Sequence, residues 1–300
     1  MKLFFSPRNA VVLTFLSTLS LTTAAPYVDW MNDYTGNEAN TSFLWKFDTA
    51  TGVTTDSSGN GVNTGIATTG TSTGDPGKFG EAFYSGPDRS SANNSYAQGN
   101  SASETAFNAS ALSVEFWYKP LSDTITTTTL SYFFDKKFDK PVGLLLRLNN
   151  VGTNSQRLEF SVGNGTSSKG LMTEDLTWDP SQWYHIAVTY ENLEGDGYLK
   201  IFRNGELLAQ DTALGFGDLS FEHVQRIEID PETEEETPVM GTYRFRLANR
   251  LGSSYGSAPG YYDNLRVSSV AYEYSMPIPE PGIALLGALG LATLFTRRRG

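Results

Sequence analysis

The sequence contains no cysteine, so no disulfide bond can stabilise the fold, and thiols give no clue to the compartment. It has only two histidines, which excludes a zinc site of the His/Cys type. Basic residues are also scarce, with 22 Lys and Arg against 33 Asp and Glu. Five of the basic residues (Lys2, Arg8, Arg297, Arg298 and Arg299) lie at the chain ends, and without them the net charge falls from -11 to about -16. A surface this negative repels phosphate groups, which argues against nucleic acid as a partner, although acidity also serves solubility.

No long stretch has helical periodicity, whereas short segments with alternating apolar residues recur between Gly, Asn, Asp and Pro. These segments are 43–47, 112–118, 158–162, 186–190, 199–201, 206–209, 243–247 and 265–267. Asn204-Gly205 separates two of them, and this dipeptide favours a tight hairpin because both residues accept a positive φ. Hydrophobic residues make up 39% of the 300 residues, enough for a large core. The pattern predicts an all-β, antiparallel, two-sheet jelly-roll sandwich.

The polar segment 25–42 is expected to be a lead-in arm, and residues 43–272 to form one domain. Two stretches rich in Ser, Thr, Gly and Asn, residues 67–74 and 93–103, are predicted to be surface loops.

The N-terminus has the pattern of a secretory signal peptide. Lys2 and Arg8 precede an apolar run from Ala10 to Leu21, which is followed by small residues up to Ala25. Residues 1–24 are therefore predicted to direct export through the Sec translocon and to be removed by signal peptidase. The alternative, a retained anchor, is disfavoured because the apolar run has only about 12 residues.

The C-terminal segment 273–300 combines three features in series. Pro279-Glu280-Pro281 precedes an apolar segment, residues 282–296, and Arg297-Arg298-Arg299 follow it. A helix of this length spans roughly 22 Å of a hydrocarbon core of about 30 Å, so it is expected to be a short inner-membrane anchor. The arginines are expected to stay in the cytoplasm, which places the body outside.

This tail closely resembles the PEP-CTERM sorting signal of Gram-negative bacteria. The resemblance implies an exosortase as partner, removal of the helix, and final localisation in the cell envelope or outside the cell. A permanent single-span anchor is the alternative.

Several segments of the body resemble concanavalin A-like, LamG-like jelly rolls. They match the opening segment, a middle strand, a hairpin region and the closing strand of that family, in order: 43–48 with 56–61, 113–120, 183–190 with 199–207, and 262–267. The resemblance supports the fold, but this fold carries lectins, adhesion modules and enzymes. His185 is expected to make a cross-strand hydrogen bond, whereas Trp117 and Trp178 are candidates either for the core or for stacking on sugar rings.

Asp56, Ser58, Asn60 and Gly61 have the spacing that begins a calcium-binding loop, but Ala67 stands where a bidentate carboxylate would be needed. The family resemblance implies that the opening loop and the closing strand share a calcium ion. Asp56, Asn60 and Asp263 are therefore the candidate ligands, and a tight turn without an ion is the alternative.

Glu228, Asp230 and Glu232 alternate as do the catalytic carboxylates of laminarinase-type glycoside hydrolases, which share this fold. Pro231 removes a ladder hydrogen bond from the strand that would have to carry them, and is expected to end the strand that begins at Val224. We therefore predict a non-catalytic module that binds extracellular glycan or matrix, with no catalytic residue. A glycoside hydrolase using these three carboxylates, or a structural surface protein without a ligand, are the alternatives.

Overall fold

The computed structural model describes residues 26, 28–36, 38–49, 53–67, 73–87, 96–123, 130–139, 141–149, 156–233, 235–250 and 256–275. Regular structure in these residues is almost entirely β-strand, with one short 3-10 helix, η1 (Ser101–Glu104). The strands are β1 (Thr41–Trp45), β2 (Val53–Thr54), β3 (Thr64–Ala67), β4 (Thr73–Pro76), β5 (Glu81–Tyr84), β6 (Tyr96–Gly99), β7 (Ala111–Pro120), β8 (Ser131–Asp139), β9 (Val142–Asn149), β10 (Arg157–Gly163), β11 (Ser168–Met172), β12 (Tyr184–Leu193), β13 (Asp196–Arg203), β14 (Glu206–Ala213), β15 (His223–Ile229), β16 (Glu236–Gly241), β17 (Arg246–Leu247) and β18 (Gly260–Ser268).

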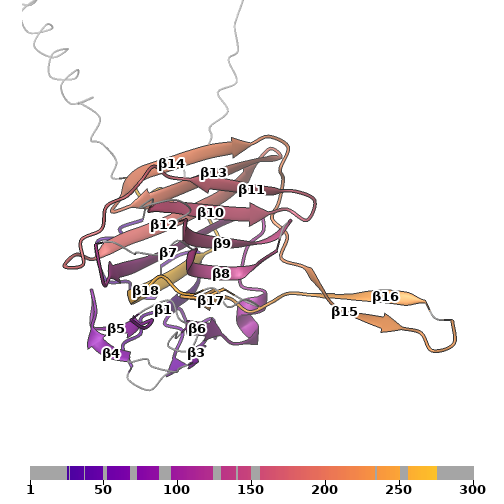
Figure 1. The fold of residues 1–300 in the computed structure, drawn as a ribbon, viewed down its shortest axis with the longest axis horizontal. Coiled ribbons are helices and arrows are strands. Elements are labelled where there is room, and N and C mark those ends of the chain that lie inside the picture. Colours follow the sequence, from indigo (N-terminus) through magenta and orange to yellow (C-terminus); the bar gives the residue numbers. More distant parts are fainter. Residues whose placement is uncertain are drawn as a thin grey trace, which may run out of the picture.

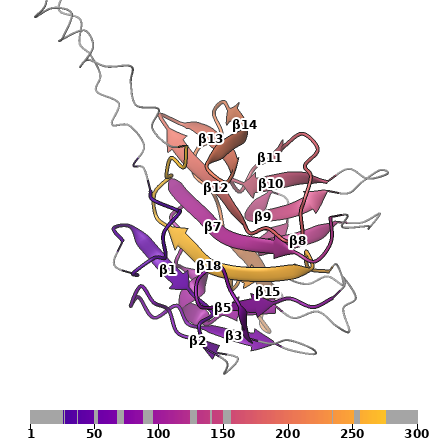
Figure 2. The ribbon, with the colours of Figure 1, turned by 90° about the vertical axis from the view of Figure 1, so that its left-hand side faces the viewer.

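The strands form two antiparallel sheets that pack face to face. The arm-side sheet has the order β14-β13-β12-β7-β18-β5-β4, with β1 also paired to β18. The pocket-side sheet has the order β11-β10-β9-β8-β17-β6-β3-β2. Figure 1 shows the pocket-side strands stacked across the molecule, and Figure 2 shows β7 and β18 side by side in the arm-side sheet. This arrangement confirms the predicted jelly-roll sandwich.

The core lies between the two sheets and follows the alternation of the sequence. In β7, Leu112, Val114 and Phe116 are fully buried and belong to one cluster with Leu158 and Phe160 of β10. Successive residues of a strand point to opposite faces, so every second residue of these strands enters the core and the others face outward. Trp117 and Trp178 are buried as well, so neither is exposed to stack on a sugar.

The outer face of the arm-side sheet is covered by both ends of the described chain. Val28, Trp30 and Tyr34 of the arm form a second apolar cluster with Tyr272 and Tyr274. The arm is therefore part of the packed structure, and this sheet has one face in the main core and the other under the arm.

The Asn204-Gly205 hairpin is confirmed, since the two residues have φ values of 52° and 75° and connect β13 to β14. The loop predicted at 93–103 is wrong in its middle part, because Tyr96–Gly99 forms β6 and pairs with β3 and β17. Pairing on both sides of a strand outweighs a polar, Gly-containing composition.

A two-stranded hairpin, β15–β16, extends away from the sandwich (Figure 1). β15 ends at Ile229, so the predicted strand end before Pro231 is confirmed. Glu236 begins β16 and pairs with Ile229.

The predicted signal peptide (1–24), the motif Pro279-Glu280-Pro281, the apolar segment 282–296 and the terminal arginines all lie outside the described residues. Within the described residues, no helix is both long enough and apolar enough to span a bilayer.

Candidate functional site

A polar pocket of about 390 Å³ lies on the outer face of the pocket-side sheet. Strands β8 to β11 form its floor, and the segment after β17 contributes Arg250 to its wall. Its lining residues are Phe138, Asp139, Leu145, Arg147, Glu159, Ser161, Ser168, Lys169, Gly170 and Arg250.

The centre of the pocket is a bidentate ion pair between neighbouring strands. Arg147 of β9 stands opposite Glu159 of β10 in the antiparallel register. The Nη2 of Arg147 donates to Glu159 Oε1 at 2.7 Å, and its Nε donates to Oε2 at 3.0 Å. Asn149 donates to Oε2 at 2.7 Å and Ser161 to Oε1 at 3.1 Å. The carboxylate of Glu159 is therefore fixed by hydrogen bonds from three side chains while the pocket above it stays open.

Arg147 remains cationic, because hydrogen bonds and the charge of Glu159 outweigh burial and raise its pKa. Beside it, the hydroxyl of Tyr132 accepts hydrogen bonds from Arg147 at 3.4 Å and from Arg250 at 3.3 Å. The guanidinium of Arg250 also lies over the ring of Tyr132, 5.6 Å from its centroid. Fixed polar groups beside the apolar side chains of Tyr132, Phe138 and Leu145 are typical of small-molecule sites.

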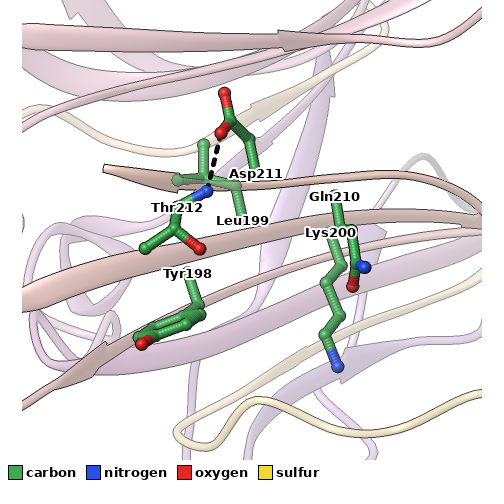
Figure 3. A pocket seen from close by; sticks show the side chains of 6 residues that line it. All are labelled: Tyr198, Leu199, Lys200, Gln210, Asp211 and Thr212. Carbon is green, nitrogen blue, oxygen red and sulfur yellow. Dashed lines mark hydrogen bonds between the residues drawn. The ribbon is translucent and has the colours of Figure 1, made fainter. Parts of the chain in front are cut away.

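A second hollow of about 400 Å³ lies over β13 and β14 of the other sheet. Figure 3 shows Tyr198, Lys200 and Gln210 extending from these strands toward the same side, with Asp211 on the opposite side. Lys200 pairs with Glu273 at 3.0 Å. The hollow thus offers an aromatic ring but lacks the interlocked polar network of the pocket on β8 to β11.

The carboxylate of Asp56, the first candidate calcium ligand, accepts hydrogen bonds from backbone N–H groups around its own loop. Its Oδ1 accepts hydrogen bonds from the N–H groups of Leu44 and Ser58, both at 2.9 Å, and Oδ2 accepts from Val62 N at 3.1 Å. Asn60 uses its Nδ2 to donate to the carbonyls of Thr41 and Ser42. These contacts are those of a tight turn, which was the alternative to calcium.

Asp263, the third candidate, contacts a different loop, the one that contains Phe79. Its Oδ2 accepts a hydrogen bond from Phe79 N at 2.8 Å. Its Oδ1 and Glu81 Oε2 are buried without a hydrogen-bond partner among the described residues. Burial raises the pKa of Asp263 to about 8, and the nearby charge of Asp48 adds to this effect. An orphaned buried carboxylate oxygen fits a cation, so calcium suits Asp263 and its neighbour Asp48 better than it suits Asp56.

The loop 77–81 wraps closely around these carboxylates. A Cβ added at Gly77 would lie 2.7 Å from Asp263 Oδ2, and one added at Gly80 would lie 2.1 Å from Asp48 Oδ1. In the part of the chain that the structure describes, no group of three or more His, Cys, Asp and Glu side chains is arranged to hold a metal. A calcium ion here would therefore need backbone carbonyls and water as its further ligands.

The acidic triplet lies on the exposed hairpin. Glu228 pairs with Arg226 at 2.5 Å, and Asp230 Oδ1 accepts hydrogen bonds from the N–H groups of Glu232 and Thr233 in the turn. These N–H groups lower the pKa of Asp230. A glycosidase acid needs a raised pKa on a rigid floor, whereas the pKa of Asp230 is lowered and all three carboxylates are exposed on the hairpin.

The pocket residues Arg147, Glu159, Asn149 and Arg250 were missed by sequence reasoning. The available signal was weak: Arg147 and Asn149 alternate with buried leucines in β9, as Glu159 and Ser161 alternate with buried residues in β10. His185, in contrast, makes the expected cross-strand contact, with Nε2 2.9 Å from Glu115 Oε2.

With this geometry in view, comparisons with known proteins agree on the fold. Residues 91–221 match the family model described as the concanavalin A-like lectin/glucanases superfamily. No curated protein matches the sequence. Among solved structures, the receptor-binding domain of botulinum neurotoxin mosaic serotype C/D is similar with a TM-score of 0.50 and 12% identity, over 80% of this chain and 49% of that one.

Two further similar structures are carbohydrate-binding proteins by name. A putative carbohydrate-binding protein from Bacteroides ovatus has 22% identity and a TM-score of 0.35, over 55% of this chain and 39% of that one. The CBM40 of the Ruminococcus gnavus IT-sialidase, bound to α2,3-sialyllactose, has 15% identity and a TM-score of 0.35. The match covers 56% of this chain and 80% of that one. The chain spans about half the length of the neurotoxin structures it matches. At these identities the similarity concerns the fold alone.

Proposed function

We propose that this protein is an exported, non-catalytic module that binds glycan in the pocket on β8 to β11. The observation that carries the proposal is the Arg147–Glu159 network, which holds several donors and acceptors in fixed positions at the base of an open pocket. Sugars offer adjacent hydroxyl groups, and planar Arg, Glu and Asn side chains match them with paired hydrogen bonds. The match to a lectin and glucanase superfamily supports the same class of ligand.

A binding role fits this pocket better than hydrolysis. Both oxygens of Glu159 accept hydrogen bonds from Arg147, so neither is left to face the leaving oxygen of a glycosidic bond. A glycoside hydrolase needs one carboxyl group that can donate its proton to the leaving oxygen.

A glycan array followed by titration calorimetry tests the proposal. The isosteric variant Glu159→Gln should weaken binding of an array hit roughly tenfold, because one charged acceptor of the network is lost. Lys200→Met, in the hollow over β13 and β14, is the matched control and should bind like wild type. If Glu159→Gln bound the glycan as tightly as wild type while Lys200→Met lost binding, the site would lie on the other sheet, over β13 and β14. Release of reducing ends from the bound glycan would instead support a hydrolase.

Export and sorting are part of the same proposal. The signal-peptide pattern of residues 1–24 supports passage through the Sec translocon and cleavage by signal peptidase. The resemblance of the last 25 residues or so to PEP-CTERM signals supports an exosortase as the second processing partner. The module would then act in the cell envelope or outside the cell, where glycans are exposed.

We also propose a structural calcium ion, held by Asp263 and Asp48 together with backbone carbonyls of the loop 77–81. The orphaned Oδ1 of Asp263 supports this choice. Asp56 and Asn60 then act as turn residues that position the opening loop.

A further inference from the structure

One face of the β15–β16 hairpin is apolar and exposed. The register pairs Val224 with Met240 and Ile227 with Pro238, which places these residues and Ile229 on the same face of the ribbon. Val224, Ile227, Ile229 and Met240 are 54%, 56%, 61% and 48% exposed. Exposed aliphatic residues concentrated on one face of a projecting hairpin are typical of a protein contact surface.

The hairpin also lacks support from the sandwich in the described residues, where β15 and β16 pair only with each other. An isolated two-stranded hairpin is marginally stable in water. A partner that covers the apolar face would therefore stabilise the hairpin as well as bury its side chains.

The apolar face continues into a hollow at the base of the hairpin. This hollow has a volume of about 650 Å³ and is lined by Val224 and Met240 of the hairpin and by Pro141 and Val142 of the sandwich. The acidic residues Asp139 and Glu222 also line it. A bound segment could thus lie along the hairpin and insert a side chain at its base.

The charges around this face indicate which class of partner it can bind. The hairpin carries exposed acidic residues at Asp230, Glu232, Glu235 and Glu236, whereas Glu228 lies on the face opposite Ile227 and Ile229. Its one arginine, Arg226, is already paired with Glu228. A second copy of the chain would bring the same acidic set into contact with itself, and an anionic lipid surface would be repelled in the same way.

We propose that this apolar face with its acidic rim is a docking site for a partner protein segment that presents aliphatic side chains flanked by Lys or Arg. The aliphatic side chains cover Ile227 and Ile229, and the basic residues lie against the carboxylates of the rim. The hollow at the base of the hairpin shares Asp139 with the pocket on β8 to β11. The residues substituted in the two tests belong to one site each, so failure of one proposal can be told from failure of the other.

The test uses defined peptides and the mature protein. The probe is a fluorescein-labelled peptide of about ten residues in which Val and Lys alternate, and binding is measured by fluorescence anisotropy. The wild-type protein should bind it, and should bind the Glu/Val and Lys/Ser versions at least roughly tenfold more weakly. The double variant Ile227→Ser/Ile229→Ser should lose roughly tenfold in affinity.

Leu214→Ser is the matched control, because Leu214 is 82% exposed but lies outside the hairpin. It should bind the Val/Lys peptide like wild type. A charge variant, Glu235→Lys/Glu236→Lys, should weaken binding even if the serine variant unfolds the hairpin. Equal binding of the Lys/Ser peptide, or unchanged binding by both hairpin variants, would overturn the proposal. So would a dimer in sedimentation experiments that the serine variant abolishes, since the occupant would then be a second copy.

Discussion

At the residue scale, Glu115 is a fully buried carboxylate beneath the arm. Its Oε1 accepts a hydrogen bond from Arg266 Nε at 2.7 Å, and its Oε2 accepts one from the Tyr34 hydroxyl at 2.5 Å and contacts His185 Nε2 at 2.9 Å. Burial by itself would raise the pKa of Glu115, but Arg266 and His185 more than offset burial and lower the pKa to about 2. The ionised form is therefore the native form.

This lowered pKa predicts a stability change in acid. The stabilisation from Glu115 is present above the ordinary glutamate pKa of 4.5 and is lost as the pH falls from there toward 2. Glu115→Gln leaves Arg266 buried without its counter-ion, so it should lower the free energy of unfolding by about 3 kcal/mol at neutral pH. It should also flatten the acid dependence between pH 4.5 and 2, as measured by urea denaturation at a series of pH values. Glu228→Gln, on the exposed hairpin, should change stability by less than about 0.5 kcal/mol, and a similar small effect of Glu115→Gln would contradict the prediction.

Calcium gives a second prediction for single residues. Excess calcium should raise the melting temperature of the wild-type protein, because an ion that binds only the folded state stabilises it by mass action. Asp263→Ala should abolish this shift. Asp56→Ala should lower the melting temperature, because its loop hydrogen bonds are lost, yet should retain the calcium shift. Scanning calorimetry with EDTA as the reference measures both, and no shift in wild type would remove the calcium proposal.

At the scale of elements, alternation predicted the strands that have one face in the core. β7, β10, β12, β13 and β14 were all expected near their observed positions. β8 and β9 were not expected, because β9 carries Leu144, Leu145 and Leu146 in succession and β8 is interrupted by two register shifts. Both features hide the period of two on which strand prediction depends.

The pocket on β8 to β11 was beyond prediction for a related reason. It joins Arg147 of β9 to Glu159 of β10 across a strand pair, and Arg250 reaches it from a distant segment. Only the register of the sheet brings these residues together, and register depends on turns and bulges that the sequence pattern leaves open.

The arm was expected to be a polar lead-in, but its aromatic residues hold it to the sheet. Trp30 stacks on His185 with ring centroids 4.9 Å apart, and its Nε1 donates to the carbonyl of Tyr274 at 3.0 Å. Trp30→Ala should therefore lower the free energy of unfolding by about 3 kcal/mol. Hydrogen exchange should speed up in residues 28–36 and 272–274 more than in β12, because the arm opens before the sandwich. Met31→Ala, at a position 45% exposed, is the control and should leave exchange unchanged; uniform loss of protection in Trp30→Ala would show that the arm is not a separate unit.

At the scale of the whole molecule, the two ends of the described body are joined to each other. Glu273 N donates to the carbonyl of Pro26 at 2.9 Å, and Val28 N donates to the carbonyl of Glu273 at 3.4 Å. The first and last described segments of the body therefore lie side by side.

For the whole molecule, we expect processing at both ends of the chain. Protein purified from its native host should lack residues 1–24 and the apolar segment 282–296, since a helix of roughly 22 Å is short for a permanent anchor. Intact mass spectrometry measures both cleavages in one experiment. Replacing Pro279, Glu280 and Pro281 by Ala should keep the C-terminal segment on the protein and the protein in the membrane fraction, while leaving the melting temperature unchanged. A wild-type mass that still includes Gly282 to Arg299 would show that the tail is a lasting anchor.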